Sequence, residues 1–273
     1  MTAQLLRHEG FAALLAETGD HPFVRYDVSP ALATTWWQVR DAVAFRRTGH
    51  RGHASWTVLG SDEGVAAVVH ALPGLLREQG PVRPGRAGHD GRAGHDGRVG
   101  RRPASVSVPQ HLEPLLHERF RVSGGGDWEW FFTTQAPAEV DSAETVVPLD
   151  HVARRDEVAA FLAAHSPTAD TQPGGPEWWF AVESPGHGLR AVTAYGLTGS
   201  GAPILSSVAV DSAARGRGLG RRIVGTVTRL AVHERGVCTL AMYSSNAGAR
   251  ALYRSLGYTC PVAWASRAVL PLP

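Results

Sequence analysis

The order of apolar and polar positions predicts regular structure in two long stretches of the chain. In the first stretch, Ser55–Leu59 has the apolar run of a strand, and 63–78 repeats apolar residues at helical spacing. Further strands are expected at 105–108 and 127–133, with a helix at 111–119 between them. These elements predict an additional α/β domain in the N-terminal half.

The second stretch begins near Thr145 and alternates strands with helices more regularly. The expected strands are 145–149, 178–183, 189–197, 203–210, 237–242 and 261–268. The expected helices are 156–165, 219–234, which ends at a cap on Gly236, and 247–256. Strands that are interrupted by helices and joined by tight turns predict a mixed α/β sheet flanked by helices.

Two breaks in composition set the domain boundaries. The hexapeptide Ala-Gly-His-Asp-Gly-Arg occurs twice in succession within 85–102, and such a segment has little to bury. Residues 135–144 are rich in Ala, Pro, Ser and acids, as linkers are. We therefore expect a domain at 1–134 that contains a flexible loop at 85–102, a linker at 135–144 and a second domain at 145–273.

The repeat loop could be read as a metal clip, since it contains His89, Asp90, His95 and Asp96. A flexible repeat holds ligands weakly, so no metal is predicted. Deleting Ala87–Arg98 is expected to leave thermal stability and turnover nearly unchanged, because a segment with little to bury makes few contacts. A large loss of activity in the deleted protein would instead place the loop in the site.

The predicted strand at 127–133 is unusually aromatic. Trp128, Trp130 and Phe132 alternate with Glu129, Phe131 and Thr133, and a run of three glycines at 124–126 resembles the turn that leads into the strand. One interpretation is a sheet that packs its aromatic face inward. The other is an aromatic shelf on which a ligand stacks.

Composition excludes several classes of function. The chain is 43% hydrophobic and has a formal charge of +2, and no apolar run is long enough to span a membrane, so we expect a soluble, cytoplasmic protein that binds neither nucleic acid nor membrane. All 27 basic residues are arginines. Phosphate-binding P-loops, protein kinases and Schiff-base enzymes each need a lysine, so they are excluded. The two cysteines, in apolar stretches, indicate buried thiols rather than a disulfide framework.

A glycine-rich turn is the strongest chemical signal. The apolar strand that ends in Val208, Ala209 and Val210 leads through 211–214 into Arg215-Gly216-Arg217-Gly218-Leu219-Gly220, where a helix begins. Unpaired amides at a helix start, glycines and neighbouring arginines, which include Arg221 and Arg222, favour a phosphate-bearing ligand. A turn without a ligand is the alternative. The dinucleotide fingerprint fails, since its third glycine would fall on Arg221 or Ile223.

A second motif follows one helix and one strand later. Residues 246–258 fit the pattern N-x-x-A-x-x-L-Y-x-x-x-G-[YF] at every specified position. Asn246 can cap a helix, Leu252 and Leu256 share one face of it, and Gly257 can end it. Tyr253 is the one position that helix formation does not explain, and a core tyrosine is the simplest reading of it.

The first motif has the form R-x-x-G-x-G at Arg215, Gly218 and Gly220. Together, the two motifs make residues 145–269 similar to the GNAT superfamily of acyltransferases. The resemblance implies the GNAT fold, whose central sheet is mixed and mostly antiparallel. It also implies an N-acetyltransferase that moves an acetyl group from acetyl-CoA to a primary amine of a small molecule, peptide or protein, by direct attack in a ternary complex. A regulatory module that binds acyl-CoA without catalysis is the alternative.

The resemblance also implies roles for individual residues. The pyrophosphate would lie on the amides of 216–221, and Arg215 belongs to the same motif. The pantetheine arm would run along Val208 and Val210, close to Asn246, and an amide near Val208 or Ala209 would stabilise the oxyanion. Tyr253 would protonate the leaving thiolate.

The general base stays unassigned. The strand at 203–210 contains Ser206 and Ser207 but no carboxylate, where some relatives place a glutamate. Glu177, Glu183 and His187 are candidates by location only, and a chain of waters is the alternative. The acceptor, the acyl chain length and the oligomeric state do not follow from the sequence.

The N-terminal half loosely repeats the C-terminal one, since 111–133 echoes 247–268 in its order of helix and strand. It is interpreted either as a degenerate copy of the same fold or as an accessory domain. No R-x-x-G-x-G motif occurs before residue 134, so this half is not expected to bind CoA.

Overall fold

The computed structural model describes residues 4–48, 54–79, 103–139 and 145–272. The chain divides into two units: the first contains Met1–Trp128 and Ala263–Pro273, and the second contains Glu129–Val262. This division differs from the sequence-based one, because 129–134 joins the second unit and 263–273 joins the first. The repeat loop at 85–102 and the linker residues 140–144 lie outside the described residues.

The first unit is an α/β unit with one sheet. Its strands are β1 (Leu6–Glu9), β2 (Thr35–Val39), β3 (Ala42–Thr48), β4 (Ala54–Leu59), β5 (Ala104–Pro109), the first part of β6 (Phe120–Thr133) and the last part of β12 (Thr259–Pro271). Its helices are α1 (Phe11–Glu17), α2 (Pro22–Asp27), α3 (Asp62–Gln79), the 3₁₀ helix η2 (Gln110–Leu112) and α4 (Pro114–His117). The strand order is β1-β2-β3-β4-β5-β12-β6, with β4 and β5 parallel.

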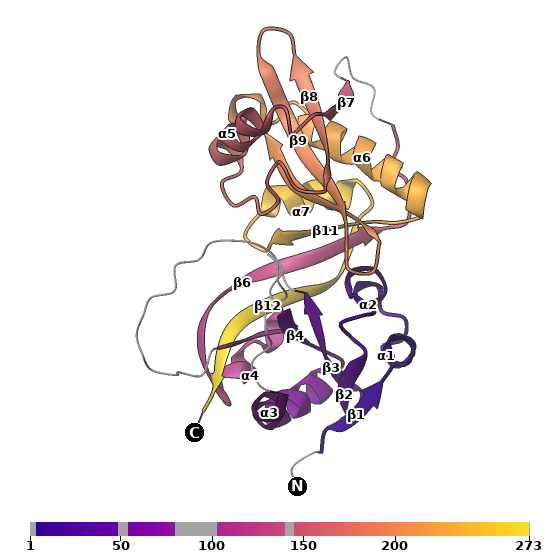
Figure 1. The fold of residues 1–273 in the computed structure, drawn as a ribbon, viewed down its shortest axis with the longest axis vertical. Coiled ribbons are helices and arrows are strands. Elements are labelled where there is room, and N and C mark those ends of the chain that lie inside the picture. The colour runs from indigo at the N-terminus through magenta and orange to yellow at the C-terminus, as the bar shows by residue number, and fades with distance from the viewer. Residues whose placement is uncertain (1–3, 49–53, 80–102, 140–144, 273) are drawn as a thin grey trace. The chain divides into compact units, whose positions relative to one another are not determined.

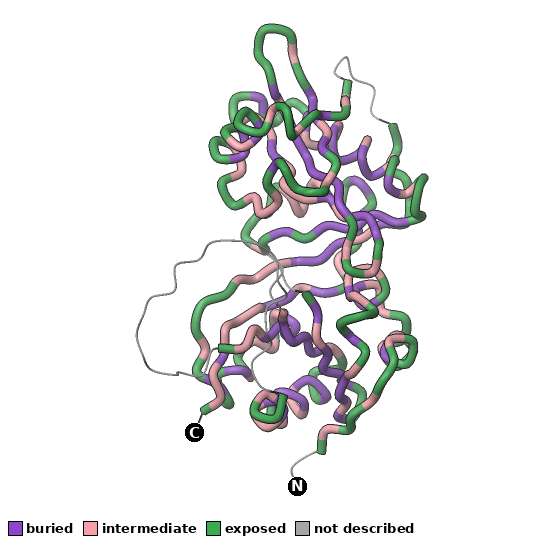
Figure 2. Tube along the Cα trace, in the orientation of Figure 1, coloured by how far each residue is buried: buried purple, intermediate pink, exposed green. Residues whose placement is uncertain are grey.

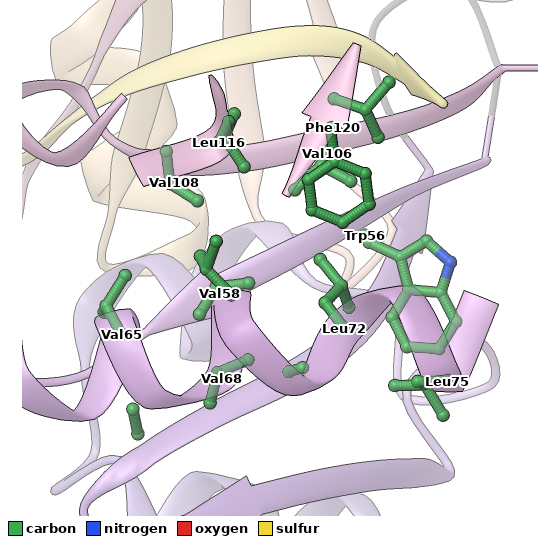
Figure 3. Close-up of a cluster of buried hydrophobic side chains, with 14 of the residues drawn as sticks. Trp56, Val58, Val65, Val68, Leu72, Leu75, Val106, Val108, Leu116 and Phe120 are labelled. Atoms are coloured by element: carbon green, nitrogen blue, oxygen red, sulfur yellow. The ribbon is translucent and has the colours of Figure 1, made fainter. Parts of the chain in front are cut away.

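The core of the first unit lies between α3 and the sheet. Val65, Val68 and Leu72 of α3 lie toward Trp56 and Val58 of β4, and all five side chains are buried (Figure 3). Their spacing is the helical period that predicted α3, and the helix extends only one residue beyond the prediction at each end.

The second unit carries both sequence motifs. Its elements are β7 (Val146–Leu149), α5 (Arg155–His165), β8 (Trp178–Ser184), β9 (Gly188–Leu197), β10 (Pro203–Val210), the 3₁₀ helix η3 (Ser212–Ala214), α6 (Leu219–Arg235), β11 (Cys238–Tyr243) and α7 (Ala247–Ser255), with the ends of β6 and β12 that belong to it (Figure 1). The strand order is β12-β6-β11-β10-β9-β8-β7, and β7 to β10 pair antiparallel. The predicted mixed, mostly antiparallel sheet is confirmed.

Helices cover both faces of this sheet. Ile223 and Val227 of α6 are buried with Tyr195 of β9, whereas Val158 of α5 is buried with Val192 of the same strand. Because side chains alternate between the faces of a strand, α5 and α6 lie on opposite faces. Buried positions follow the strands, and exposed ones gather in turns and on the outer sides of helices (Figure 2). No described helix has the length and apolar character needed to cross a membrane.

Two predicted features of the first unit are wrong in detail. The helix expected at 111–119 is a 3₁₀ turn followed by the short α4, because Pro114 is favoured in the first turn of a helix and disfavours one continuous helix through that position. The glycines 124–126 lie within β6 rather than in a turn before it. A Cβ on Gly125 would stand 2.0 Å from the carbonyl oxygen of Ser266, so glycine permits a close approach to β12.

The aromatic positions of β6 are part of the cores. Trp130 and Phe131 point to opposite faces of the strand, and both are fully buried. Trp130 also stacks on Phe132, with 5.6 Å between ring centroids. These positions favour inward packing over an exposed shelf for a ligand.

The two units repeat one topology. In each, an antiparallel pair of strands leads to a helix and then to a strand that returns parallel: β3, β4, α3, β5 in the first unit and β9, β10, α6, β11 in the second. The parallel pairs also match, because each is registered over only two residues. The N-terminal half is therefore a copy of the C-terminal topology, and α4–β6 corresponds to α7–β12 as the sequence suggested.

Candidate functional site

The parallel strands of the second unit separate partway along their length. Ile204 pairs with Thr239 and Leu205 pairs with Leu240, and within these two fully described strands the pairing ends there, although β10 continues to Val210. Beyond Leu205, the edge of β10 that faces β11 is therefore not paired with it. An extended ligand could bind to such an edge as an additional strand.

A bulge in β10 lies at the same point. Its pairing with β9 shifts between Ser206 and Ala209, and Ser207 has a left-handed backbone with φ of 50°. A left-handed residue other than glycine costs about 1–3 kcal/mol. The hydroxyl groups of Ser206 and Ser207 offset this cost by donating to the hydroxyl and the carbonyl oxygen of Thr171, at 2.8 and 2.7 Å. The bulge is thus held from the loop after α5.

The glycine-rich turn connects β10 to α6. Asp211 begins it, and its carboxylate accepts a hydrogen bond from the Ala213 amide at 2.9 Å. Gly216 and Gly218 have φ of 78° and 84°, a conformation that favours glycine. Gly218 is the N-cap of α6, where no side chain caps the helix and its first turn holds no acidic residue. The first amides and the helix dipole thus favour an anion there.

The three glycines of this turn have different surroundings. A Cβ on Gly216 or Gly218 would have no atom within 4 Å, whereas a Cβ on Gly220 would stand 3.3 Å from Leu252 and 3.6 Å from Val210. Gly216 and Gly218 therefore border open space. Gly220 instead allows α6 to pack closely on α7 and β10. A side chain on Gly220 would therefore disturb this packing and would not project into the space beside the helix start.

Two of the predicted cationic residues hold the turn in place. Arg215 donates to the carbonyl oxygen of His165 at 2.8 Å, and Arg221 donates to the hydroxyl of Ser255 at 2.6 Å. These bonds link the turn to the ends of α5 and α7. Both side chains are exposed, as is Arg217, so their charges still surround the turn.

Tyr253 is buried in the apolar cluster of the second unit. This cluster also contains Leu205 and Leu240, the last paired residues of β10 and β11. The ring centroid is 6.0 Å from those of Phe131 and Tyr258. Among the described residues, its hydroxyl has no hydrogen-bond partner.

Burial raises the pKa of the Tyr253 phenol to about 12. The neutral form is thus favoured, and the associated stability is present below the ordinary pKa of about 10 and is lost as the pH rises through about 12. We expect no loss of kcat through ionisation of Tyr253 up to a pH of about 10. The measurement is the pH profile of kcat for the parent and for Tyr253→Phe. A decline with a midpoint near the ordinary pKa of about 10, seen only in the parent, would contradict this expectation.

Asn246 caps α7, as its place in the motif predicted. Its side-chain oxygen accepts from the Ala249 amide at 3.0 Å. The residue is exposed and lies in the turn that connects the end of β11 to α7. The structure therefore gives Asn246 a structural role at one wall of the separated strands.

The family comparison agrees with this geometry. Residues 176–260 match the model of the acetyltransferase (GNAT) domain. The C-terminal part of the chain is a GNAT domain. The match includes the bulge, the glycine-rich turn and Tyr253.

Solved structures with related folds cover both halves of the chain. A GCN5-related N-acetyltransferase from Sphaerobacter thermophilus is 13% identical, with a TM-score of 0.54 over 98% of this chain and 96% of that one. A GNAT-family acetyltransferase from Novosphingobium aromaticivorans is 18% identical, with a TM-score of 0.49 over 95% of this chain and 97% of that one. At such identities the first of these likenesses supports the fold alone. No curated protein sequence matches the chain.

The three candidates for the general base have different surroundings. Glu183 is bound to Arg154 at 2.5 Å, and His187 lies exposed in the turn between β8 and β9. Glu177 is half-buried and lies beside Gly196, where an added Cβ would be 3.2 Å from Glu177 and 3.7 Å from Ile204 of β10. Of the three candidates, only Glu177 therefore lies beside the strand with the bulge.

The corresponding turn of the first unit has the opposite charge. The first turn of α3 contains Asp62 and Glu63, and Glu63 is paired with Arg40 at 3.1 Å. Acidic side chains at a helix start disfavour a phosphate ligand there. Within the described part of the chain, no group of three or more His, Cys, Asp or Glu side chains could hold a metal ion, and His89 and His95 lie outside that part.

Sequence reasoning missed two sets of contacts around the site. Thr171, which holds the bulge, belongs to no sequence motif. Its partners Ser206 and Ser207 lie 35 and 36 positions further along the chain. Glu129 of β6 binds Arg250 of α7 across 121 positions. Neither set has a local signal, although Arg250 lies within the second motif.

Proposed function

We propose that the GNAT domain transfers an acetyl group from acetyl-CoA to a primary amine of a small molecule, peptide or protein. The amine would attack the thioester directly in a ternary complex. The residues of the site fit acetyl-CoA in three respects: a strand edge for the extended arm, an uncapped helix start for the pyrophosphate, and a tyrosine hydroxyl without a described partner.

Binding would use the backbone of two segments. The amides of 216–221 would bind the pyrophosphate, and Arg215, Arg217 and Arg221 would add positive charge around it. The unpaired edge of β10 at Val208 and Val210 would hydrogen-bond the pantetheine arm. The turn that holds Asn246 would border the arm on the other side.

The chemistry would form one C–N bond and break one C–S bond. The amine nitrogen attacks the acetyl carbon, and an amide near Val208 or Ala209 stabilises the oxyanion. When the C–S bond breaks, Tyr253 gives its proton to the thiolate. The surplus proton of the amine leaves to water or to Glu177, the carboxylate nearest to β10 among the candidates.

One observation supports this proposal most strongly. The Tyr253 ring belongs to the same buried cluster as Leu205 and Leu240, the last paired residues of β10 and β11. We infer that its hydroxyl would lie near the end of the strand edge on which the thioester is placed. Buried hydroxyl groups are normally hydrogen-bonded. A Tyr253 hydroxyl without a described partner therefore favours a role with a ligand over a role in packing alone.

The test is thiol release from acetyl-CoA with a library of primary amines, with mass spectrometry of the products. We expect thiol release that depends on the amine and yields the acetylated amine. The chain contains no lysine, so acetylated amines can be distinguished cleanly from modified enzyme side chains. Tight binding of acetyl-CoA without turnover of any amine would favour a regulatory module instead.

A further inference from the structure

Glu129 and Arg250 form a partly buried ion pair in the second unit. The Nε atom of Arg250 donates to both oxygens of Glu129, at 2.9 and 3.0 Å, and Nη2 donates to one of them at 2.5 Å. The Glu129 side chain is only 9% exposed. The fork of the guanidinium thus meets the carboxylate in the geometry that gives strong, oriented hydrogen bonds.

The same guanidinium binds a third segment. Nη2 of Arg250 also donates to the carbonyl oxygen of Ser244, in the turn between β11 and α7. That turn contains Asn246, whose carbonyl oxygen accepts from the Arg250 amide at 3.1 Å. Tyr253 follows three residues later on α7, about one helical turn away. One side chain therefore ties β6, the β11–α7 turn and the helix that carries Tyr253.

A gain in folding stability is a weak explanation for the presence of this ion pair. Removing two charges from water costs about as much as their attraction returns, and apolar replacements are often neutral or stabilising. A rigid pair of this kind gives orientation instead. Arg250 contacts the backbone of the turn directly, so it fixes the turn and the start of α7 relative to β6.

We propose that Glu129 and Arg250 are positioning residues that hold the β11–α7 turn and the start of α7 for acyl-CoA binding and proton transfer. This inference rests on the proposed function of the site. Neither residue touches the reacting atoms. Their effect on the reaction passes through Asn246 and Tyr253.

The test compares Glu129→Gln with a matched control on the same strand. Asp127 of β6 binds Arg267 at 2.7 Å in the first unit, so Asp127→Asn removes a similar charge from a similar pair without touching the site. We expect Glu129→Gln to lower kcat about tenfold and to raise the KM for acetyl-CoA severalfold, since small displacements of catalytic groups cost that much. Asp127→Asn should leave both constants within about twofold of the parent. Thermal melts of both variants record any shared loss of stability.

Two further variants keep the test decisive if Glu129→Gln folds poorly. Arg250→Lys retains the charge but loses the fork that reaches both Glu129 and Ser244, so it should reproduce the loss of kcat in milder form. The double variant Glu129→Gln/Arg250→Met should be no worse in kcat than the more impaired single variant, because the two residues act as one unit. Additive losses in the double variant would overturn the inference.

The outcomes separate this inference from the proposed function. If the parent turns over an amine and Glu129→Gln retains its kcat and KM, or if Asp127→Asn is impaired equally, the pair has only a structural role. If the parent turns over no amine, the proposed function fails, and calorimetry then decides the inference. An unchanged affinity of Glu129→Gln for acetyl-CoA would overturn it, and a severalfold weaker affinity would support it.

Discussion

Replacing Tyr253 with Phe is expected to lower kcat by about 10² to 10⁴ while the affinity for acetyl-CoA stays near that of the parent. The ring contacts with Phe131 and Tyr258 remain, and the hydroxyl makes no hydrogen bond to a described residue, so little packing is lost. A proton donor matters when the thiolate forms and little before, so the loss belongs in kcat. The measurement is kcat and acetyl-CoA affinity for both proteins, with thermal melts.

A second tyrosine provides the control. The Tyr258 hydroxyl shares a buried hydrogen bond with Thr228 at 2.7 Å, so Tyr258→Phe should cost about 1 kcal/mol of stability and little turnover. The loss in Tyr253→Phe should also shrink with a more acidic leaving thiol, which needs less help from an acid. Turnover of Tyr253→Phe within about threefold of the parent would show that another group protonates the thiolate.

Replacing Gly218 with Val is expected to weaken acetyl-CoA binding roughly ten- to a hundredfold. A β-branched residue in a left-handed conformation is strained by about 1–3 kcal/mol, and the turn would relieve this strain by moving away from the geometry that binds the pyrophosphate. A tenfold loss of affinity corresponds to about 1.4 kcal/mol. The added side chain would also project into the open space beside the first turn of α6. Isothermal titration of acetyl-CoA into both proteins measures the change.

Gly236 offers a matched control at the other end of the same helix. It caps α6 with φ of 74°, and a Cβ there would likewise meet no atom within 4 Å. Gly236→Val should therefore lose similar stability and keep its affinity for acetyl-CoA. Gly220 is a poorer test, because a side chain there would disturb the packing of α6 on Leu252. Equal affinities of the Gly218→Val protein and the parent would remove the phosphate site from the turn.

Local patterns predicted much of the second unit. The bounds of β10 were predicted without error, and α6 was predicted to within one residue, because a continuous apolar strand, a glycine turn and a helical period are each local signals. The first unit was harder. The hairpin of β2 and β3 turns at Arg40, whose φ is 55°, and an arginine in place of Gly or Asn hides the turn. The elements before Ala54 were therefore not predicted.

Long-range pairing could not be predicted from local patterns. The last residues of β12 pair with β5, so Trp264 lies opposite Pro109, although the two are far apart in the chain. The end of β6 joins the second unit in the same way. Among the site residues, the motifs pointed to Tyr253 and to the glycines. They could not show that Gly220 packs inward or that Thr171 holds the bulge, because both depend on where distant segments meet.

The central claim is that the separated strands and the glycine-rich turn of the second unit bind acyl-CoA. Calorimetric titration of the parent with acetyl-CoA tests it most directly, because it needs no knowledge of the acceptor. We expect one molecule bound per chain, since the corresponding turn of the first unit is acidic. The absence of binding by a folded parent would contradict the claim. Two molecules bound per chain would contradict only the expectation that the first unit binds none.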